Sequence, residues 1–132
     1  MKKIAVLLIA FCVVACSQEK SQQERWVKIY EGKTGRIYYG DLESLDRKTN
    51  QGWVRIDAEK APLERGGNKK ATSVMNLIKA DCKEKHIKIV YLIDKYQDGT
   101  KEKFENKENL KIYAEPETSV EATLDWLCGR KM

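Results

Sequence analysis

ATSVMNLIKADC at residues 71–82 and HIKIVYLIDKY at residues 86–96 decide the fold of this 132-residue chain. The two segments are rich in β-branched and aromatic residues, and a short polar KEK segment separates them. This composition predicts two consecutive long strands. The second strand is apolar on both of its faces, so each face of the sheet needs a cover at this point.

Shorter strands are expected on either side of this pair. The segments at residues 25–30, 35–40, 52–58 and 110–114 are also β-rich, and turn-forming residues lie between them. Residues 59–70 contain one proline and two adjacent glycines and predict a mobile loop. The sequence therefore predicts an α+β fold built on a single antiparallel, twisted sheet of about six strands.

One segment, residues 118–128, has the spacing of a helix. Thr118 and Glu121 make a T-x-x-E capping box, and Gly129 suits the position just after a helix end. The apolar stripe of this helix consists of Val120, Leu124 and Leu127. We expect this C-terminal helix to pack on one face of the sheet.

Alternation along the two long strands predicts which face the helix covers. In the first strand, the face expected under the helix holds Cys82, Ala80, Ile78, Asn76 and Val74, whereas Met75 and Leu77 point away. In the second strand, one predicted face holds Ile87, Ile89, Tyr91 and Ile93, and the other holds Val90 and Leu92. A loop or a second subunit is expected to cover the helix-free face, which makes a homodimer one hypothesis for this surface.

The first 24 residues differ in composition from the rest of the chain. Residues 1–15 combine two lysines with an apolar run that is too short to span a bilayer, as is typical of a signal peptide. The run ends in VVAC, which resembles a bacterial lipobox and predicts acylation of Cys16 and anchoring in a lipid bilayer. Residues 16–24 predict a lipidated tether, because residues 17–24 have no apolar side chain. The domain is expected at residues 25–132.

Two of the four cysteines are left outside this N-terminal segment. Cys82 and Cys128 can form only one disulfide, in a compartment that permits disulfides. The alternatives are two free thiols or a metal pair. A disulfide is favoured because two cysteines without nearby histidine partners make a poor zinc site. Such a bond would attach the helix to the end of the strand at residues 71–82.

Composition argues against several classes of function. The formal net charge is +5 with both signs interspersed, which is too small and too scattered an excess to imply nucleic-acid binding. The one histidine, His86, is expected to be exposed. No nucleophile-elbow motif and no arguable pair of catalytic carboxylates are present. We therefore predict no enzyme activity, no cofactor and no metal.

The order of several residues resembles the surface-adhesin E family of bacterial lipoproteins. These residues are the lipobox, Trp26, Tyr38-Tyr39, Trp53-Val54, Asp81-Cys82 and the segment Pro116…Ser119…Cys128. The resemblance covers residues 25 to 129. It implies a twisted antiparallel sheet, a C-terminal helix fixed by a disulfide, a dimeric form, and binding to host matrix and plasma proteins.

Two positions depart from the pattern of that family. The family often has a tryptophan shortly before the Pro-x-x-Ser segment, where Tyr113 is the nearest aromatic residue here. It also often has Ser-x-Lys in the long strand, whereas Val74 and Met75 follow Ser73. We therefore carry over no binding residue from the family.

Four side chains are candidates for contact with a partner. Trp126 lies away from the apolar stripe of the helix, and an exposed tryptophan can anchor a protein interface. Arg65, Lys69 and Lys70 flank the Gly-Gly segment, and mobile basic loops can bind acidic glycosaminoglycans or acidic protein patches.

These observations favour an adhesin-like surface lipoprotein of the outer membrane that binds host or extracellular macromolecules. The alternative is a periplasm-facing envelope lipoprotein with a structural or assembly role and no catalytic activity. The lipobox does not distinguish the two, because both proteins would carry the same anchor.

Overall fold

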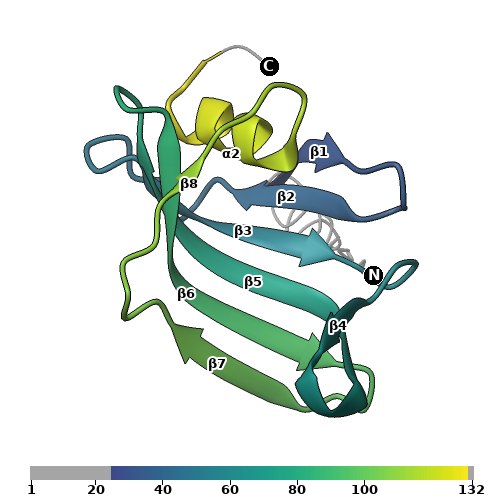
Figure 1. Cartoon of the computed structure of the whole chain (residues 1–132). Coiled ribbons are helices and arrows are strands. Elements are labelled where there is room, and N and C mark those ends of the chain that lie inside the picture. Colours follow the sequence, from purple (N-terminus) through teal and green to yellow (C-terminus); the bar gives the residue numbers. More distant parts are fainter. Residues whose placement is uncertain (1–24, 131–132) are drawn as a thin grey trace, which may run out of the picture.

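Eight strands form one antiparallel sheet in the computed structural model, which describes residues 25–130. The strands are β1 (Trp26–Glu31), β2 (Ile37–Asp41), β3 (Gln51–Asp57), β4 (Leu63–Arg65), β5 (Lys69–Asp81), β6 (His86–Tyr96), β7 (Lys101–Glu105) and β8 (Ile112–Tyr113). A turn of 3-10 helix, η1 (Gly66–Asn68), follows β4, and the helix α2 (Ser119–Leu127) packs across one end of the sheet (Figure 1). The predicted signal peptide, Cys16 and the tether lie outside the described residues.

The antiparallel sheet with one C-terminal helix is confirmed, but the predicted number of about six strands is too low. Strands β1, β2, β3, β5, β6 and β7 are neighbours in that order. Strand β4 pairs with the first residues of β5, and β8 pairs with the first residues of β6. Residues 59–70, predicted as a loop, therefore include β4 and the turn that leads into β5. Strand β7 escaped prediction because all five of its residues are exposed and it lacks a buried apolar face.

The helix begins and ends where its caps predict. The Thr118 hydroxyl accepts a hydrogen bond from the Glu121 backbone N–H at 3.2 Å, as an N-cap should. The Glu121 carboxylate accepts the backbone N–H of Glu117 rather than that of Thr118. Gly129 follows the helix with φ +73°, a left-handed conformation that glycine adopts without steric cost.

The apolar interior has two parts. Beneath the helix lie Ile29, Val54, Ile78, Ala80 and Ile87, packed against Leu124, Trp126 and Leu127. A smaller cluster of Ala71, Val74 and Tyr96 lies toward the other end of β5 and β6, with Ile56, Leu63 and Leu92 around it. The face of β5 predicted to lie under the helix is therefore divided: Ile78 and Ala80 contact the helix cluster, and Val74 belongs to the second cluster.

The predicted faces of β6 are wrong beyond Ile89 because of a β-bulge. Leu77 pairs with Tyr91 while its neighbour Ile78 pairs with Ile89, so Val90 has no partner in the register. The extra residue reverses the alternation of side chains along the strand. Leu92 consequently lies on the helix side, in the second cluster. Tyr91 and Ile93 face away from the helix together with their partners on β5.

Candidate binding surface

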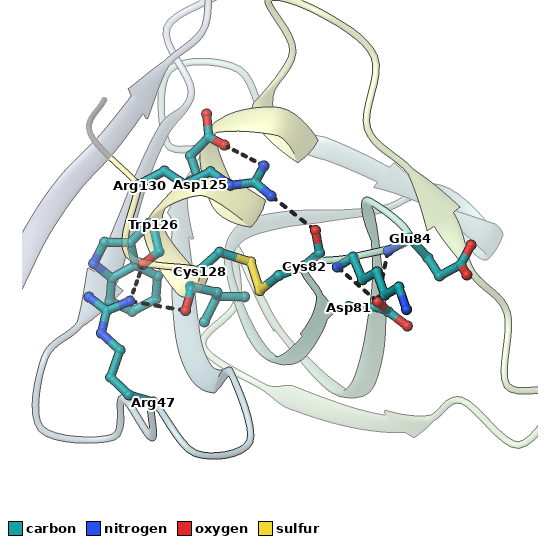
Figure 2. Close-up of a disulfide and its surroundings, with 10 residues drawn as sticks. Arg47, Asp81, Cys82, Glu84, Asp125, Trp126, Cys128 and Arg130 are labelled. Atoms are coloured by element: carbon teal, nitrogen blue, oxygen red, sulfur yellow. Dashed lines mark hydrogen bonds and ion pairs between the residues drawn. A yellow bond between two sulfur atoms is a disulfide. The ribbon is translucent and has the colours of Figure 1, made fainter.

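A disulfide and two arginines fix the helix to the sheet. Cys82 at the end of β5 is bonded to Cys128 at the C-cap of α2, with 5.8 Å between their Cα atoms. Arg130 donates to the Cys82 carbonyl at 2.9 Å, and Arg47 donates to the carbonyls of Trp126 and Leu127 at 2.9 and 3.0 Å (Figure 2). The two bonds from Arg47 go to carbonyls of the last helical turn, which lack partners within the regular helix. The predicted disulfide is confirmed, and the helix covers the end of the sheet beneath it.

Trp126 is not an exposed anchor, and its prediction as a partner contact is wrong. Its side chain is 5% exposed and lies over Gly40 of β2 and Gly52 of β3. A Cβ atom at Gly40 would fall 2.5 Å from Cε2 of the indole, so the glycine is required for this close packing. The two glycines leave space for the indole on the sheet. The buried surface of the helix therefore includes Trp126 as well as the leucine stripe.

The three basic candidates near the Gly-Gly segment have different surroundings. Arg65 donates to both carboxylate oxygens of Asp94, at 2.7 and 3.1 Å, and Asp94 is fully buried. These hydrogen bonds raise the pKa of Arg65 and give it a structural role. Lys69 lies 5.1 Å from the centre of the Tyr96 ring. Lys69 and Lys70 are both exposed, so they keep charge available at the surface.

The opposite side of the sheet carries large side chains that stay partly exposed. Cross-strand register aligns Trp53 with Leu77 and Tyr91 in one row. It aligns Tyr39 with Arg55, Met75 and Ile93 in the next. We call these residues, together with Trp26, the helix-free face; all of them have intermediate exposure. Side chains in a row of neighbouring strands lie within contact distance, so the rows form one continuous surface.

Cations lie over the aromatic rings of the helix-free face. The Arg55 guanidinium is 4.6 Å from the centre of the Trp26 ring and 4.8 Å from that of Tyr39. The Lys103 ammonium is 4.2 Å from the Tyr91 ring centre. Cation–π contacts of this kind hold rings and charges in place. The surface therefore offers fixed aromatic area and positive charge together, which suits contact with a protein surface of mixed apolar and acidic character.

The sequence predicted part of this surface correctly, since Met75 and Leu77 were expected to point away from the helix and do so. Tyr38 and Tyr39 are adjacent on β2 and lie on opposite faces: Tyr38 packs against the helix cluster, and Tyr39 joins the helix-free face. Trp53, Arg55 and Tyr91 were not predicted as site residues. Trp53 and Arg55 could have been found from the sequence, because large residues alternate in the same way on three neighbouring strands. Tyr91 could not, because the face on which it lies depends on the β-bulge.

Neither a metal centre nor a membrane span is found in the part of the chain that the structure describes. Residues 25–130 contain no group of three or more His, Cys, Asp or Glu side chains that could hold a metal ion. No helix in that range is long and apolar enough to cross a bilayer.

A comparison with protein families identifies the family of this chain. The family model described as Surface-adhesin protein E matches residues 26–129, and the chain belongs to this family. The match extends from the first residue of β1 to just beyond α2, so it covers the whole sheet and helix. Comparisons with curated proteins and with solved structures gave no match. The family is one of surface adhesins, which suggests a non-catalytic binding protein located at the cell surface.

Proposed function

We propose that this protein is a lipid-anchored adhesin of the outer membrane that binds extracellular host proteins through the helix-free face. The observation that carries the proposal is the pair of side-chain rows around Trp53 and Arg55, which are partly exposed and combine aromatic and aliphatic side chains with the Arg55 guanidinium that lies over Trp26 and Tyr39. Trp, Tyr and Arg are the residues most enriched at energetically dominant positions of protein interfaces. Lys69 and Lys70 add exposed positive charge nearby in sequence on β5 and are candidate contacts at the rim.

Binding through this face is tested with a double variant, Trp53→Ala with Tyr91→Ala, in the full-length protein. Surface plasmon resonance would measure binding to immobilised basement-membrane proteins and to plasma proteins. We expect at least a tenfold loss of affinity, because removing one central aromatic anchor commonly costs 2 kcal/mol or more. Leu110→Ala is the matched control, since Leu110 is an exposed apolar residue outside the helix-free face. Equal binding by both variants would refute the assignment.

A second copy of the chain is the competing occupant of the helix-free face. Sedimentation velocity of the same proteins separates the two cases. If the unmodified protein is a dimer and the double variant is a monomer with unchanged ligand binding, the face is a subunit interface and the proposed ligand site is wrong. A monomer that loses ligand binding on substitution supports the proposal.

Anchoring at Cys16 has a direct test. Cys16→Ala removes the thiol that would be acylated. We expect the protein to leave the membrane fraction, because the acyl chains that would form its stable anchor are then missing. Immunoblotting of membrane and soluble fractions measures this. Retention of the variant in the membrane fraction would contradict lipid anchoring through that residue.

Display outside the cell is tested by protease treatment of intact cells, with a periplasmic protein as a control for leakage. Cleavage on intact cells supports the adhesin. Protection until the outer membrane is broken would favour the periplasm-facing alternative and would make envelope proteins the partners to seek.

A further inference from the structure

An open hollow lies where β5 and β6 meet, beside the segment that leads into β3. Its volume is about 620 Å³. It is lined by the charged residues Lys48, Lys79, Lys83, Lys88 and Asp81, and by His86. The hollow therefore contains four lysines and one aspartate. Its ratio of basic to acidic residues is much higher than that of the whole chain, which carries 25 basic and 20 acidic residues.

The register of the sheet forces two of these lysines together. Lys79 of β5 pairs directly with Lys88 of β6. Like charges placed opposite each other on antiparallel strands destabilise the pair. Within residues 25–130, none of the four ammonium groups forms a salt bridge. Among residues 25–130, therefore, no carboxylate pairs directly with these lysines, and the hollow keeps an excess of positive charge.

Asp81 is engaged by the turn that follows β5. One of its carboxylate oxygens accepts the backbone N–H groups of Glu84 and Lys83, at 2.9 and 3.1 Å (Figure 2). The hydrogen bond from Glu84 is the main cause that lowers the pKa of Asp81, and the hydrogen bond from Lys83 adds to it. The carboxylate stays ionised at neutral pH and organises the turn rather than pairing with a lysine.

His86 contributes a second, independent feature of the hollow. It was expected to be exposed, but its side chain is 4% exposed because Tyr113 of β8 pairs with it and packs edge-on against the ring at 5.3 Å. Its Nδ1 atom is buried and has no hydrogen-bond partner among the described residues. Buried polar atoms in native proteins are nearly always paired, so an unpaired one beside a basic hollow points to a ligand.

We propose that this hollow binds the phosphate or sulfate ester group of an extracellular ligand. A tetrahedral oxyanion has several oxygens that can contact converging ammonium groups at once, and its charge would relieve the repulsion between Lys79 and Lys88. His86 forms part of the wall beside the bound group. Its residues differ from those of the Trp53–Tyr91 row, although Lys79 lies in the next row of the same face, and its test does not depend on adhesion.

The test uses the fact that His86 is the one histidine of the chain. Full-length protein in detergent, labelled with ¹³C- and ¹⁵N-histidine, would be titrated with inorganic phosphate, pyrophosphate and sulfate at low ionic strength. We expect a saturable shift of the imidazole resonances. Lys79→Gln with Lys88→Gln should weaken the apparent affinity at least tenfold. The absence of a saturable shift with all three anions would overturn the proposal.

A second pair of lysines provides the matched control. Lys95 and Lys101 also lie directly opposite each other, but the hollow beside Lys95 carries Glu59 and Asp98. Lys95→Gln with Lys101→Gln removes the same charge and should change the affinity less than twofold. An equal loss in both double variants would show unspecific attraction and would refute the site.

The source of the anion is identified with two further probes, a sulfated disaccharide and a sugar phosphate. Tighter binding of either ester than of its free anion supports an ester site and names the chemistry it prefers. Binding of neither ester beyond the level of the free ions would overturn the ester assignment.

Discussion

The same strands form both faces of the sheet, but the two faces differ in how much of their apolar surface is buried. Ile78 and Leu77 are adjacent on β5; Ile78 is 4% exposed beneath the helix, whereas Leu77 stays partly exposed on the helix-free face. On the helix side, Gly40 and Gly52 make room for Trp126. On the other side, the neighbouring positions of the same strands hold large residues. Hydrophobicity alone thus does not decide which residues are buried here. A residue is buried where the disulfide-bonded helix covers it.

The strongest test of this difference removes the bond that holds the cover. Replacing Cys82 and Cys128 together by Ser should lower the free energy of unfolding by about 4 kcal/mol, because the closed segment spans 46 residues in sequence. Urea denaturation monitored by tryptophan fluorescence measures the loss. The reduced form of the unmodified protein should match the double variant. An unchanged midpoint would mean that packing alone holds the helix.

The next test compares the two adjacent residues of β5. Ile78→Ala should destabilise the protein by about 3 kcal/mol, because it leaves a cavity under the helix. Leu77→Ala should cost roughly 1 kcal/mol, since its side chain is already partly in water. Thermal unfolding of both variants checks the ratio. Equal costs would show that something covers the helix-free face in solution, as a dimer would.

A smaller effect is expected from filling the glycine space. Gly40→Ala should destabilise the protein by about 2 kcal/mol, because its methyl group would overlap the Trp126 indole. Gly66→Ala is the control, since a Cβ atom there meets nothing within 4 Å. Calorimetric unfolding would compare them. If both variants behaved alike, the indole would have to move freely, which contradicts its tight packing.

The smallest effect concerns a charged pair at the end of β2. Arg25 donates to both carboxylate oxygens of the buried Asp41, at 2.8 and 3.0 Å, and these hydrogen bonds are the main cause that lowers the pKa of Asp41. The stabilisation is present above the pKa of an unfolded aspartate, about 3.9, and is lost as the pH falls through the lowered folded value. Asp41→Asn should therefore flatten the decline of stability below about pH 4. Unfolding at stepwise lower pH measures this, with Glu64→Gln as the control.

Local signals predicted the elements whose residues carry them. The caps of α2 and the two long strands followed from Thr118, Gly129 and the β-rich runs, because these depend on neighbouring residues. Strand β7 did not, because its pairing with β6 supplies its structure and its own residues are exposed. The faces of β6 required the unpaired residue at Val90, which no local pattern reveals.

The candidate site was predicted less well because it depends on tertiary packing. Helical spacing predicted that Trp126 lies at the surface, yet its indole packs on glycines of two strands that are distant in sequence. His86 was expected in water, yet Tyr113 covers it from β8. Arg65 was expected in a mobile loop, yet it pairs with a buried aspartate 29 positions away. The family resemblance and the disulfide were confirmed, since both were predicted from which residues occur along the chain rather than from how they pack.

The position of the disulfide also decides how the domain would respond to mechanical force. If the proposed anchor at Cys16 holds the protein, the domain is pulled from its N-terminal side, and the load enters the sheet at β1, which is an edge strand. The disulfide encloses residues 82–128, so a pulled chain can lengthen over residues 25–81 by at most roughly 200 Å before it reaches the covalent loop. Strand β6 and the helix, which lie within the covalent loop, would stay linked while β1 to β3 peel away, whereas Lys48 would leave the lysine hollow with the peeled segment. Single-molecule stretching should therefore record a longer extension after reduction than before it.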